Sequence, residues 1–274
     1  MNNPRTSNKV GIYVDSSNLY YNGGFKMQYD ILRDYACRDG SEPVRMNAYV
    51  SFDRERSLED LMYRNKALSF HDALRALGYK VVIKDVIRYK DDEGNTYTKA
   101  NADIDMVVDM MLQSDYLDRV LLATGDGDFV RLVEALQNKG VRVEVLAFEN
   151  ISNQLRTEAD YFTSGYIVPN LLPMGSALER ESWGASGTRV RGWCSRYNPD
   201  KGIGSMTYLK QIPHSLYLND VRNPDYFESA FFHFSELYNT SVQYQLPSSR
   251  HIFEFTVVEN ERGLKAEEIK LLTW

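Results

Sequence analysis

The sequence has little of the chemistry from which structural zinc sites and disulfide frameworks are built. It contains two cysteines, Cys37 and Cys194, and four histidines in 274 residues, without a Cys/His spacing typical of zinc. Two distant thiols are typical of a reducing compartment. No apolar run approaches the roughly 18 residues of a membrane span, and the N-terminal residues MNNPRTSN contain no apolar signal core. We therefore expect a cytoplasmic protein with no membrane partner.

A surplus of basic residues is also lacking. The formal net charge is −6, from 32 Lys and Arg against 38 Asp and Glu, whereas phosphate contacts usually leave a basic footprint. Residues 1–188 hold 28 acidic and 22 basic side chains, and residues 189–274 hold ten of each. The distribution of charge matters more than its sum, because the surplus carboxylates belong to the N-terminal part.

The hydrophobic pattern of the first 168 residues alternates between strands and helices. Short apolar runs predict strands at 10–14, 44–52, 79–89, 119–124 and 141–148. Helical spacing of apolar residues predicts helices at 58–77, 101–114 and 128–138. In the helix at 101–114, the apolar stripe consists of Ile104, Val107, Val108, Met111 and Leu112. This alternation predicts an α/β fold in which helices flank a parallel sheet.

The pattern changes after about residue 168. Pro and Gly interrupt residues 169–187, which we interpret as a linker. Alternating segments at 189–197, 203–209, 230–234 and 251–258 then predict the antiparallel strands of a small all-β barrel. We expect two domains, residues 8–168 and 188–272.

Four aspartates are expected at one edge of the predicted sheet. Asp15 follows the first strand, Asp126 and Asp128 follow the strand at 119–124, and Asp103 begins a helix. Ligands of parallel α/β sheets bind beyond the C-terminal ends of the strands. Converging carboxylates repel one another unless a cation lies between them, and oxygen ligands without His or Cys select Mg²⁺ or Mn²⁺. Such an ion can activate water for attack on a phosphodiester.

Each of these aspartates also has a simpler interpretation as a helix cap, because carboxylates stabilise helix N-termini. For a single aspartate, capping is the better interpretation. For all four at one sheet edge, the functional interpretation is favoured. Asp105 lies on the side of the apolar stripe opposite Asp103, and Asp109 is expected further round towards solvent.

Three segments resemble motifs of NYN domains, including those of the LabA-like bacterial group. Val14–Leu19 (VDSSNL) resembles the (V)DxxN(L) motif, Lys99–Asp109 resembles the KxxxDvxxxxD helix, and Thr124–Phe129 (TGDGDF) resembles SGDxDF. The segments occur in the family's order, and the only departure in the last is Thr124 for the common Ser. The resemblance covers about residues 8–168.

This resemblance implies a PIN-like fold and a metal-dependent endoribonuclease with an acidic site of Asp15, Asp103, Asp126 and Asp128. It implies that Asn18 supports the metal site, and Asp109 is a less certain member. By the same analogy Lys99 contacts a substrate phosphate, although an exposed lysine without such a role is an equally good interpretation.

The C-terminal part resembles cold-shock domains in three segments, Tyr197–Gly204, Ala230–Leu237 and Phe253–Ala266, with a long insertion near 209–229. The resemblance implies an OB fold that stacks bases of single-stranded RNA on aromatic side chains. Here Arg196 replaces an expected Trp, and Ile203 and Ser205 replace aromatics.

The residues that remain for RNA binding in the predicted barrel are Arg196, Tyr197, Lys201, Phe231 and His233. Together with Arg189 and Arg191, and against Asp200, the basic residues give a local charge of +3. A barrel that serves protein contacts or dimerisation is the alternative.

Three functions are therefore weighed. The first is a ribonuclease whose barrel recruits single-stranded RNA, and the second is a non-catalytic RNA-binding regulator that retains the NYN fold. The third is a DNA nuclease, because a phosphodiester site alone does not distinguish the sugars. The intact aspartates favour the first, and assembly as a homo-oligomer stays open.

Overall fold

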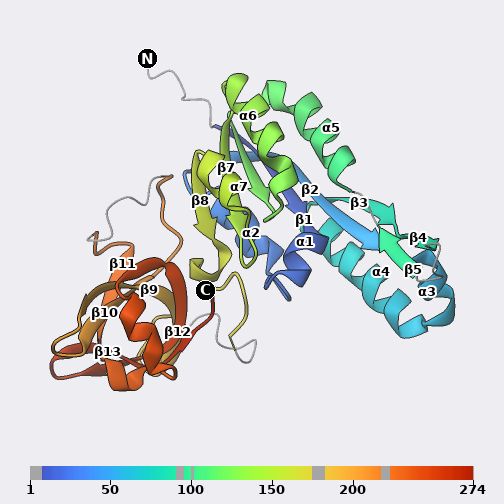
Figure 1. The fold of residues 1–274 in the computed structure, drawn as a ribbon. Helices are drawn as coiled ribbons and strands as arrows, with labels where there is room; N and C mark the ends of the chain where they lie inside the picture. The colour runs from blue at the N-terminus through green and yellow to red at the C-terminus, as the bar shows by residue number, and fades with distance from the viewer. Residues whose placement is uncertain (1–7, 91–95, 100–101, 175–182, 217–222, 274) are drawn as a thin grey trace, which may run out of the picture. The chain divides into compact units, whose positions relative to one another are not determined.

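The computed structural model describes residues 8–90, 96–99, 102–174, 183–216 and 223–273 (Figure 1). The chain divides into two compact units, residues 1–25 with 40–163 and residues 26–39 with 164–274. None of the helices within the described ranges is long and apolar enough to cross a membrane.

The first unit is built on a six-stranded sheet of strand order β3-β2-β1-β6-β7-β8. Its strands are β1 (Lys9–Asp15), β2 (Glu42–Phe52), β3 (Lys80–Asp85), β6 (Arg119–Ala123), β7 (Arg142–Ala147) and β8 (Tyr161–Ser164). The pairings β3-β2, β2-β1, β1-β6 and β6-β7 are parallel. The predicted α/β fold with a parallel sheet is therefore confirmed. The central strands β1 and β6 are buried almost throughout, which explains their nearly continuous apolar runs.

Helices cover both faces of this sheet. Figure 1 shows α5 and α6 on one face and α1 and α4 on the other. The helical elements are α1 (Ser16–Tyr21), α3 (Arg54–Glu59), α4 (Leu61–Ala76), α5 (Asp103–Gln113), η1 (Ser114–Tyr116), η2 (Gly127–Phe129), α6 (Val130–Asn138) and α7 (Asn153–Glu158).

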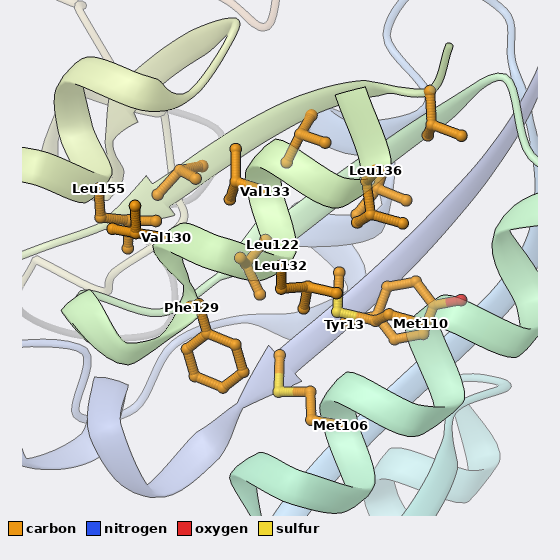
Figure 2. Packing of buried hydrophobic residues seen from close by; sticks show 14 of the residues in the cluster. Tyr13, Met106, Met110, Leu122, Phe129, Val130, Leu132, Val133, Leu136 and Leu155 are labelled. Carbon is orange, nitrogen blue, oxygen red and sulfur yellow. The ribbon is translucent and has the colours of Figure 1, made fainter. Parts of the chain in front are cut away.

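The core-facing side of α5 differs from the predicted one. Met106 and Met110 are buried in the same hydrophobic cluster as Leu132 (Figure 2), whereas Ile104 and Val108 are exposed. Leu112 is exposed as well, and Val107 and Met111 are only partly buried. The predicted stripe was wrong because α5 carries apolar residues on two faces, and periodicity alone does not show which face meets the sheet.

Two other predicted elements are divided in the structure. The helix predicted at 58–77 is broken between α3 and α4 at Asp60, whose carboxylate caps α4 by accepting a hydrogen bond from the Tyr63 amide at 2.8 Å. The strand predicted at 79–89 is β3 followed by β4 (Ile87–Lys90), which pairs with β5 (Thr96–Lys99) in a separate antiparallel ribbon. Apolar periodicity does not detect a polar cap or a change of pairing partner.

The second unit contains a closed barrel of strand order β10-β11-β13-β12-β9. Its strands are β9 (Thr188–Asn198), β10 (Ile203–Leu209), β11 (Phe227–His233), β12 (Ser248–Asn260) and β13 (Gly263–Leu271). The predicted small barrel is confirmed, and five strands in this order form an OB-like barrel. The expectation of antiparallel pairing throughout was wrong, because β11 and β13 pair in parallel at Phe231 and Lys265.

The strand β13 was not among the predicted strands. Glu268 has a φ of 51° and lies at a bulge within the strand, so the buried residues Ala266 and Ile269 are three positions apart. A strand with this irregularity lacks the two-residue alternation by which strands are detected.

The second unit also contains α2 (Tyr29–Ala36), η3 (Gly165–Ile167), η5 (Phe234–Glu236) and η6 (Thr240–Gln245). The Arg38 side chain, just after α2, donates hydrogen bonds to the carbonyls of Ser215 and Leu216 in the predicted insertion. Leu171 and Leu172 of the predicted linker are buried, and residues 175–182 lie outside the described part. The boundaries 8–168, 169–187 and 188–272 stay predictions.

Candidate acidic site

The junction of β1 with α1 meets the loop after β6 at the ends of these two central strands. Val14 pairs with Ala123 in the parallel register, so Asp15 and Thr124 follow at the same level of the sheet. The loop after β6 continues through Gly125 to Asp128, and α1 begins directly after Asp15. The DxxN and TGDGDF segments are therefore brought side by side at the C-terminal edge of the sheet, where ligands of such sheets bind.

Asp15 is almost fully buried at this edge, with 7% of its surface exposed. One carboxylate oxygen, Oδ1, accepts a hydrogen bond from the Asn18 amide at 3.0 Å and so caps α1. The other, Oδ2, accepts a hydrogen bond from the Thr124 hydroxyl at 3.3 Å. The capping interpretation of Asp15 is thus correct. Each carboxylate oxygen still has a second lone pair for a further partner.

The surroundings of Asp15 disfavour its charged form. The pKa of the Asp15 carboxyl is raised to about 6, chiefly by burial and also by the charges of Asp103 and Asp126, against the hydrogen bonds from Asn18 and Thr124. Asp103 and Asp126 are therefore close enough to act on Asp15. The structure thus brings Asp103 and Asp126 within electrostatic range of Asp15, while the roles of these three aspartates stay predictions.

Asp126 and Asp128 differ in their surroundings. The carboxylate of Asp126 is partly buried and accepts a hydrogen bond from the Asp128 amide at 3.0 Å, which caps η2. The Asp126 amide in turn donates to the Thr124 hydroxyl at 3.3 Å. Thr124 therefore connects Asp15 to the backbone of Asp126, whereas the Asp128 side chain is exposed at the rim of the site.

Asn18 connects α1 to the loop after β6. Its Oδ1 atom accepts a hydrogen bond from the Gly125 amide at 2.9 Å, and the Gly125 carbonyl accepts one from the Ser152 amide at 2.9 Å. A Cβ atom on Gly125 would lie 3.3 Å from the Ile151 backbone. The site loop is therefore packed from two sides, and Asn18 is placed to position it.

Asp109 does not join the acidic site. It lies six residues after Asp103 on α5, about 9 Å along the helix, and accepts a hydrogen bond from the Tyr49 hydroxyl at 2.9 Å. Lys80 lies 3.8 Å from its carboxylate. The expectation that Asp109 points to solvent was wrong, because this side of α5 faces the buried hydroxyl of Tyr49.

The predictions for Asp105 and Lys99 differ in what the structure shows. Asp105 forms an ion pair with Lys84, in agreement with its expected separation from Asp103. Lys99 is the last residue of β5, but its side chain lies outside the described residues, so its contact with phosphate stays a prediction.

The donor set at Asp15 fits a hard cation. Its oxygen donors come from carboxylates, and the charges of Asp103 and Asp126 disfavour the charged form of Asp15. A bound cation would favour that charged form instead. Within the described ranges, no three Asp, Glu, His or Cys side chains lie close enough together to hold one ion directly. Mg²⁺ usually keeps several waters and needs only one or two carboxylates, so direct ligation by three side chains is not required.

The outer face of the barrel gathers some of the predicted RNA-binding residues. Ser205 of β10 pairs with Arg196 on β9 and with Phe231 on β11, so these three residues lie in one row. His233 pairs with Ile203 two residues along, on the same face. Phe231 is half exposed. Lys201 is exposed in the turn between β9 and β10.

Tyr197 is not brought together with Phe231. Its ring stacks on Phe232 of the barrel core, with centroids 6.0 Å apart, and its hydroxyl donates to Gln243 at 3.0 Å. Side chains alternate between the faces of a strand, so Tyr197 points to the opposite side from Arg196.

The basic patch expected on the barrel is also smaller than predicted. Glu254 forms ion pairs with Arg189 at 3.0 Å and with Arg191 at 2.9 Å. The local charge of +3 is therefore reduced. Glu254 does not pair with Arg196 or Lys201 in these ion pairs, so both remain the predicted phosphate contacts.

Residues 9–172 match the NYN domain family, and the chain belongs to this family. The chain is similar to "Low amplitude and bright protein LabA" of Synechococcus elongatus, with 32% identity over 161 residues, which covers 56% of this chain and 82% of that protein. It is also similar to the crystal structure of a protein of unknown function from Vibrio parahaemolyticus, with 28% identity and a TM-score of 0.49 over 59% of this chain and 95% of that one.

The predicted NYN resemblance is thus confirmed, whereas the resemblance of the barrel to cold-shock domains stays a prediction. Reasoning from the sequence missed two features of the site. One is the amide of Gly125 that binds Asn18. The other is a group of exposed aromatics, Tyr20, Tyr21 and Phe25, whose position just after the DxxN segment was the available signal.

Proposed function

We propose that this protein is a metal-dependent ribonuclease that hydrolyses RNA phosphodiester bonds at the acidic site. The observation that carries the proposal is Asp15, a buried carboxyl whose pKa is raised to about 6 beside Asp103 and Asp126. Capping alone does not require this arrangement, because Ser or Asn caps a helix equally well without a buried charge. Strongly perturbed carboxyls in such places are typical of functional sites. Membership of the NYN family supports an RNA-related role.

Asp15, Asp103 and Asp126 would hold Mg²⁺ or Mn²⁺, with Asp128 beside them. When bound, the ion supplies Lewis acidity, which polarises the phosphodiester and lowers the pKa of a bound water. The protein contributes rigidity: the Thr124 hydroxyl binds both the Asp15 carboxylate and the Asp126 amide. Asn18 holds the loop through Gly125. The exposed Asp128 carboxylate at the rim would act on groups that enter from solvent.

The barrel in this proposal binds single-stranded RNA. Phe231 and His233 on its outer face supply the stacking surface, and Arg196 and Lys201 contact phosphates. Tyr197 supports this face from inside the barrel through its contact with Phe232. The half-exposed ring of Phe231 beside Arg196 is the observation that supports this part of the proposal.

A nuclease assay on the full chain tests the proposal. Generic RNA and single-stranded DNA are incubated with Mg²⁺, Mn²⁺ or chelator, and the wild type is compared with Asp126→Asn. Asp105→Asn is the matched control, because this carboxylate lies on α5 but pairs with Lys84. We expect metal-dependent cleavage of RNA by the wild type and the control only. Cleavage of neither substrate by the wild type would reject the proposal, and preference for DNA would change the substrate.

A second candidate is a non-catalytic RNA-binding regulator that keeps the NYN fold. The observation in its favour is that no three potential ligands in the described ranges gather closely enough to hold an ion directly. Asp15 and Asp126 also both act as caps. RNA that binds tightly and is recovered intact in the presence of Mn²⁺ would favour this function over the first.

A further inference from the structure

Three aromatic side chains form an exposed cluster at the end of α1, directly downstream of the acidic site. Tyr20 contacts Tyr21 with ring centroids 5.2 Å apart and Phe25 with centroids 5.3 Å apart, both in edge-to-face geometry. Their exposed fractions are 54% for Tyr20, 81% for Tyr21 and 55% for Phe25. We call these three residues the α1 aromatic cluster. Because most of their surface is exposed, the hydrophobic core of the unit does not explain their presence.

The backbone that carries the cluster is anchored. The Gly24 amide donates to the carbonyl of Leu19 at 2.7 Å, which turns the chain so that Phe25 returns to Tyr20. The Asn22 side chain donates to the carbonyl of Asn18 at 2.7 Å. The Asn22 carbonyl accepts a hydrogen bond from the Glu149 amide at 2.9 Å. The cluster is therefore presented by a turn that is bound to α1 and to the loop after β7.

The cluster lies beside the acidic site because both are built on α1. Asp15 caps this helix and Asn18 is in its first turn. Tyr21 is three residues after Asn18 and four after Ser17, so it lies on the same side of the helix as these residues. The helical rise places Tyr20 and Tyr21 roughly 8 Å beyond Asp15 along the axis. Neighbouring nucleotides of one strand can span such a distance.

An RNA base is the occupant that this chemistry fits. Edge-to-face contacts within the cluster leave ring faces accessible, above all on Tyr21, and bases stack on such faces whatever their sequence. A base in a duplex is already paired and stacked, so only a base of an unpaired strand can reach an aromatic ring in this way. A phosphodiester held at the acidic site would bring its flanking bases to the cluster.

We infer that the α1 aromatic cluster stacks on a base next to the phosphodiester at the acidic site, and so makes this site selective for single-stranded RNA. The inference rests on the proposed function, because it takes the substrate to be RNA. It adds a second binding surface for bases, separate in sequence from the barrel, and it assigns strand selectivity to α1.

Binding of a short single-stranded oligoribonucleotide to the full chain tests the inference. Titrations in Mn²⁺ are read before cleavage begins, with intact RNA verified on a gel, and a second oligonucleotide lacks one base. We expect Tyr21→Ala to weaken binding roughly five- to a hundred-fold, with most of the affinity restored in Tyr21→Phe. Tyr116→Ala is the matched control, since Tyr116 is an exposed tyrosine of η1 in the same unit. For the oligonucleotide that lacks the stacked base, Tyr21→Ala and wild type should bind equally.

The outcomes separate the inference from the proposed function. If Tyr21→Ala binds single-stranded RNA as tightly as the wild type, or if the wild type binds none at low salt, the inference is wrong. If Tyr21→Ala weakens the binding of double-stranded RNA as much as that of single-stranded RNA, the inference is also wrong. A change of oligomeric state in Tyr21→Ala without a loss of RNA affinity would overturn it too, since it would indicate that the cluster contacts protein. If binding depends on Tyr21 but RNA is never cleaved with Mn²⁺, the inference stands and the nuclease proposal fails.

Discussion

The acidic site and the outer face of the barrel are built in opposite ways. At the acidic site, a buried carboxyl is held by hydrogen bonds from Asn18 of α1 and Thr124 of the loop after β6. On the barrel, Arg196 and Phe231 are brought together across three strands, with Arg196 exposed and Phe231 half exposed. At the acidic site the carboxylates repel one another, and a bound cation can relieve this repulsion. On the barrel face, substitutions of exposed side chains should change the free energy of unfolding very little. Substitutions should therefore affect chemistry and stability at the acidic site, but mainly affinity at the barrel.

The largest effect is expected for Asp126→Asn. Loss of this carboxylate should reduce RNA cleavage at least about a hundred-fold, the scale seen when one group that stabilises a transition state is removed. The fold should persist, because an Asn side chain can still accept the hydrogen bond from the Asp128 amide. Single-turnover cleavage rates and circular dichroism measure both. Normal cleavage by Asp126→Asn would mean that the reaction occurs elsewhere, and the acidic site would then not differ in function from the barrel face.

The next effect concerns the core below the acidic site. Met110→Ala should destabilise the first unit by about 2–5 kcal/mol, because a fully buried side chain leaves a cavity. Val108→Ala, on the exposed side of the same helix, should change stability by less than about 1 kcal/mol. Denaturant unfolding of the two variants gives the comparison. Equal losses would mean that α5, which carries Asp103, packs by a different face.

These two residues also show why the sequence predicts the fold better than the details of packing. The alternation of strands and helices follows from period and length, so the parallel sheet and the presence of a small barrel were predicted correctly. The face of α5 was not, since apolar residues occur on both sides of it. The position of Asp109 depends on Tyr49, which is far away in sequence and shows no local signal. Burial and side-chain pairing across elements arise only from tertiary structure.

The candidate site shows the same division. Asp15 and Asp126 could be placed at one edge because the ends of the parallel strands β1 and β6 meet there, and Asp103 was added from its place at the start of the helix at 101–114. The burial of Asp15 could not be foreseen, because it depends on how the loops pack over it. On the barrel, the neutralisation of Arg189 and Arg191 by Glu254 depends on the pairing of β9 with β12, which a list of charged residues does not reveal.

A third prediction concerns the pH dependence of stability in chelator. The pKa of Asp15 is about 6 in the folded protein and 3.8 ordinarily, so the folded state binds more protons between these values. Its contribution to stability is fully present below pH 3.8 and is lost as the pH rises through 6. Two pKa units correspond to roughly 3 kcal/mol. The unfolding free energy of wild type relative to Asp15→Asn should therefore fall across this range.

The same variant tests metal binding. Mn²⁺ at neutral pH should raise the melting temperature of the wild type more than that of Asp15→Asn, because an ion that binds only the folded state stabilises it by mass action. A flat difference in stability between pH 4 and pH 7, together with equal shifts in Mn²⁺, would mean that Asp15 is only a helix cap.

The smallest effects are expected on the barrel, where they should appear in affinity alone. Phe231→Ala should weaken binding of a long single-stranded RNA roughly five- to a hundred-fold, since each stacked base is worth about 1–3 kcal/mol. Its thermal stability should be close to that of the wild type, because the ring is half exposed. Leu264→Ala is a control for non-specific loosening, as Leu264 packs against the barrel core instead of forming part of the Arg196–Phe231 row.

Arg196→Ala gives the finest test of this face. Removal of one phosphate contact should make the dependence of log affinity on log salt shallower by about 0.7, the single-strand value for one released counterion. The acidic residues Asp200 and Glu254 are the same in both proteins, so a change in slope is due to the loss of Arg196. Titrations at several salt concentrations measure the slope. If Phe231→Ala and Arg196→Ala both bind RNA like the wild type, the barrel does not recruit RNA, and its outer face is better explained as a surface for protein contacts.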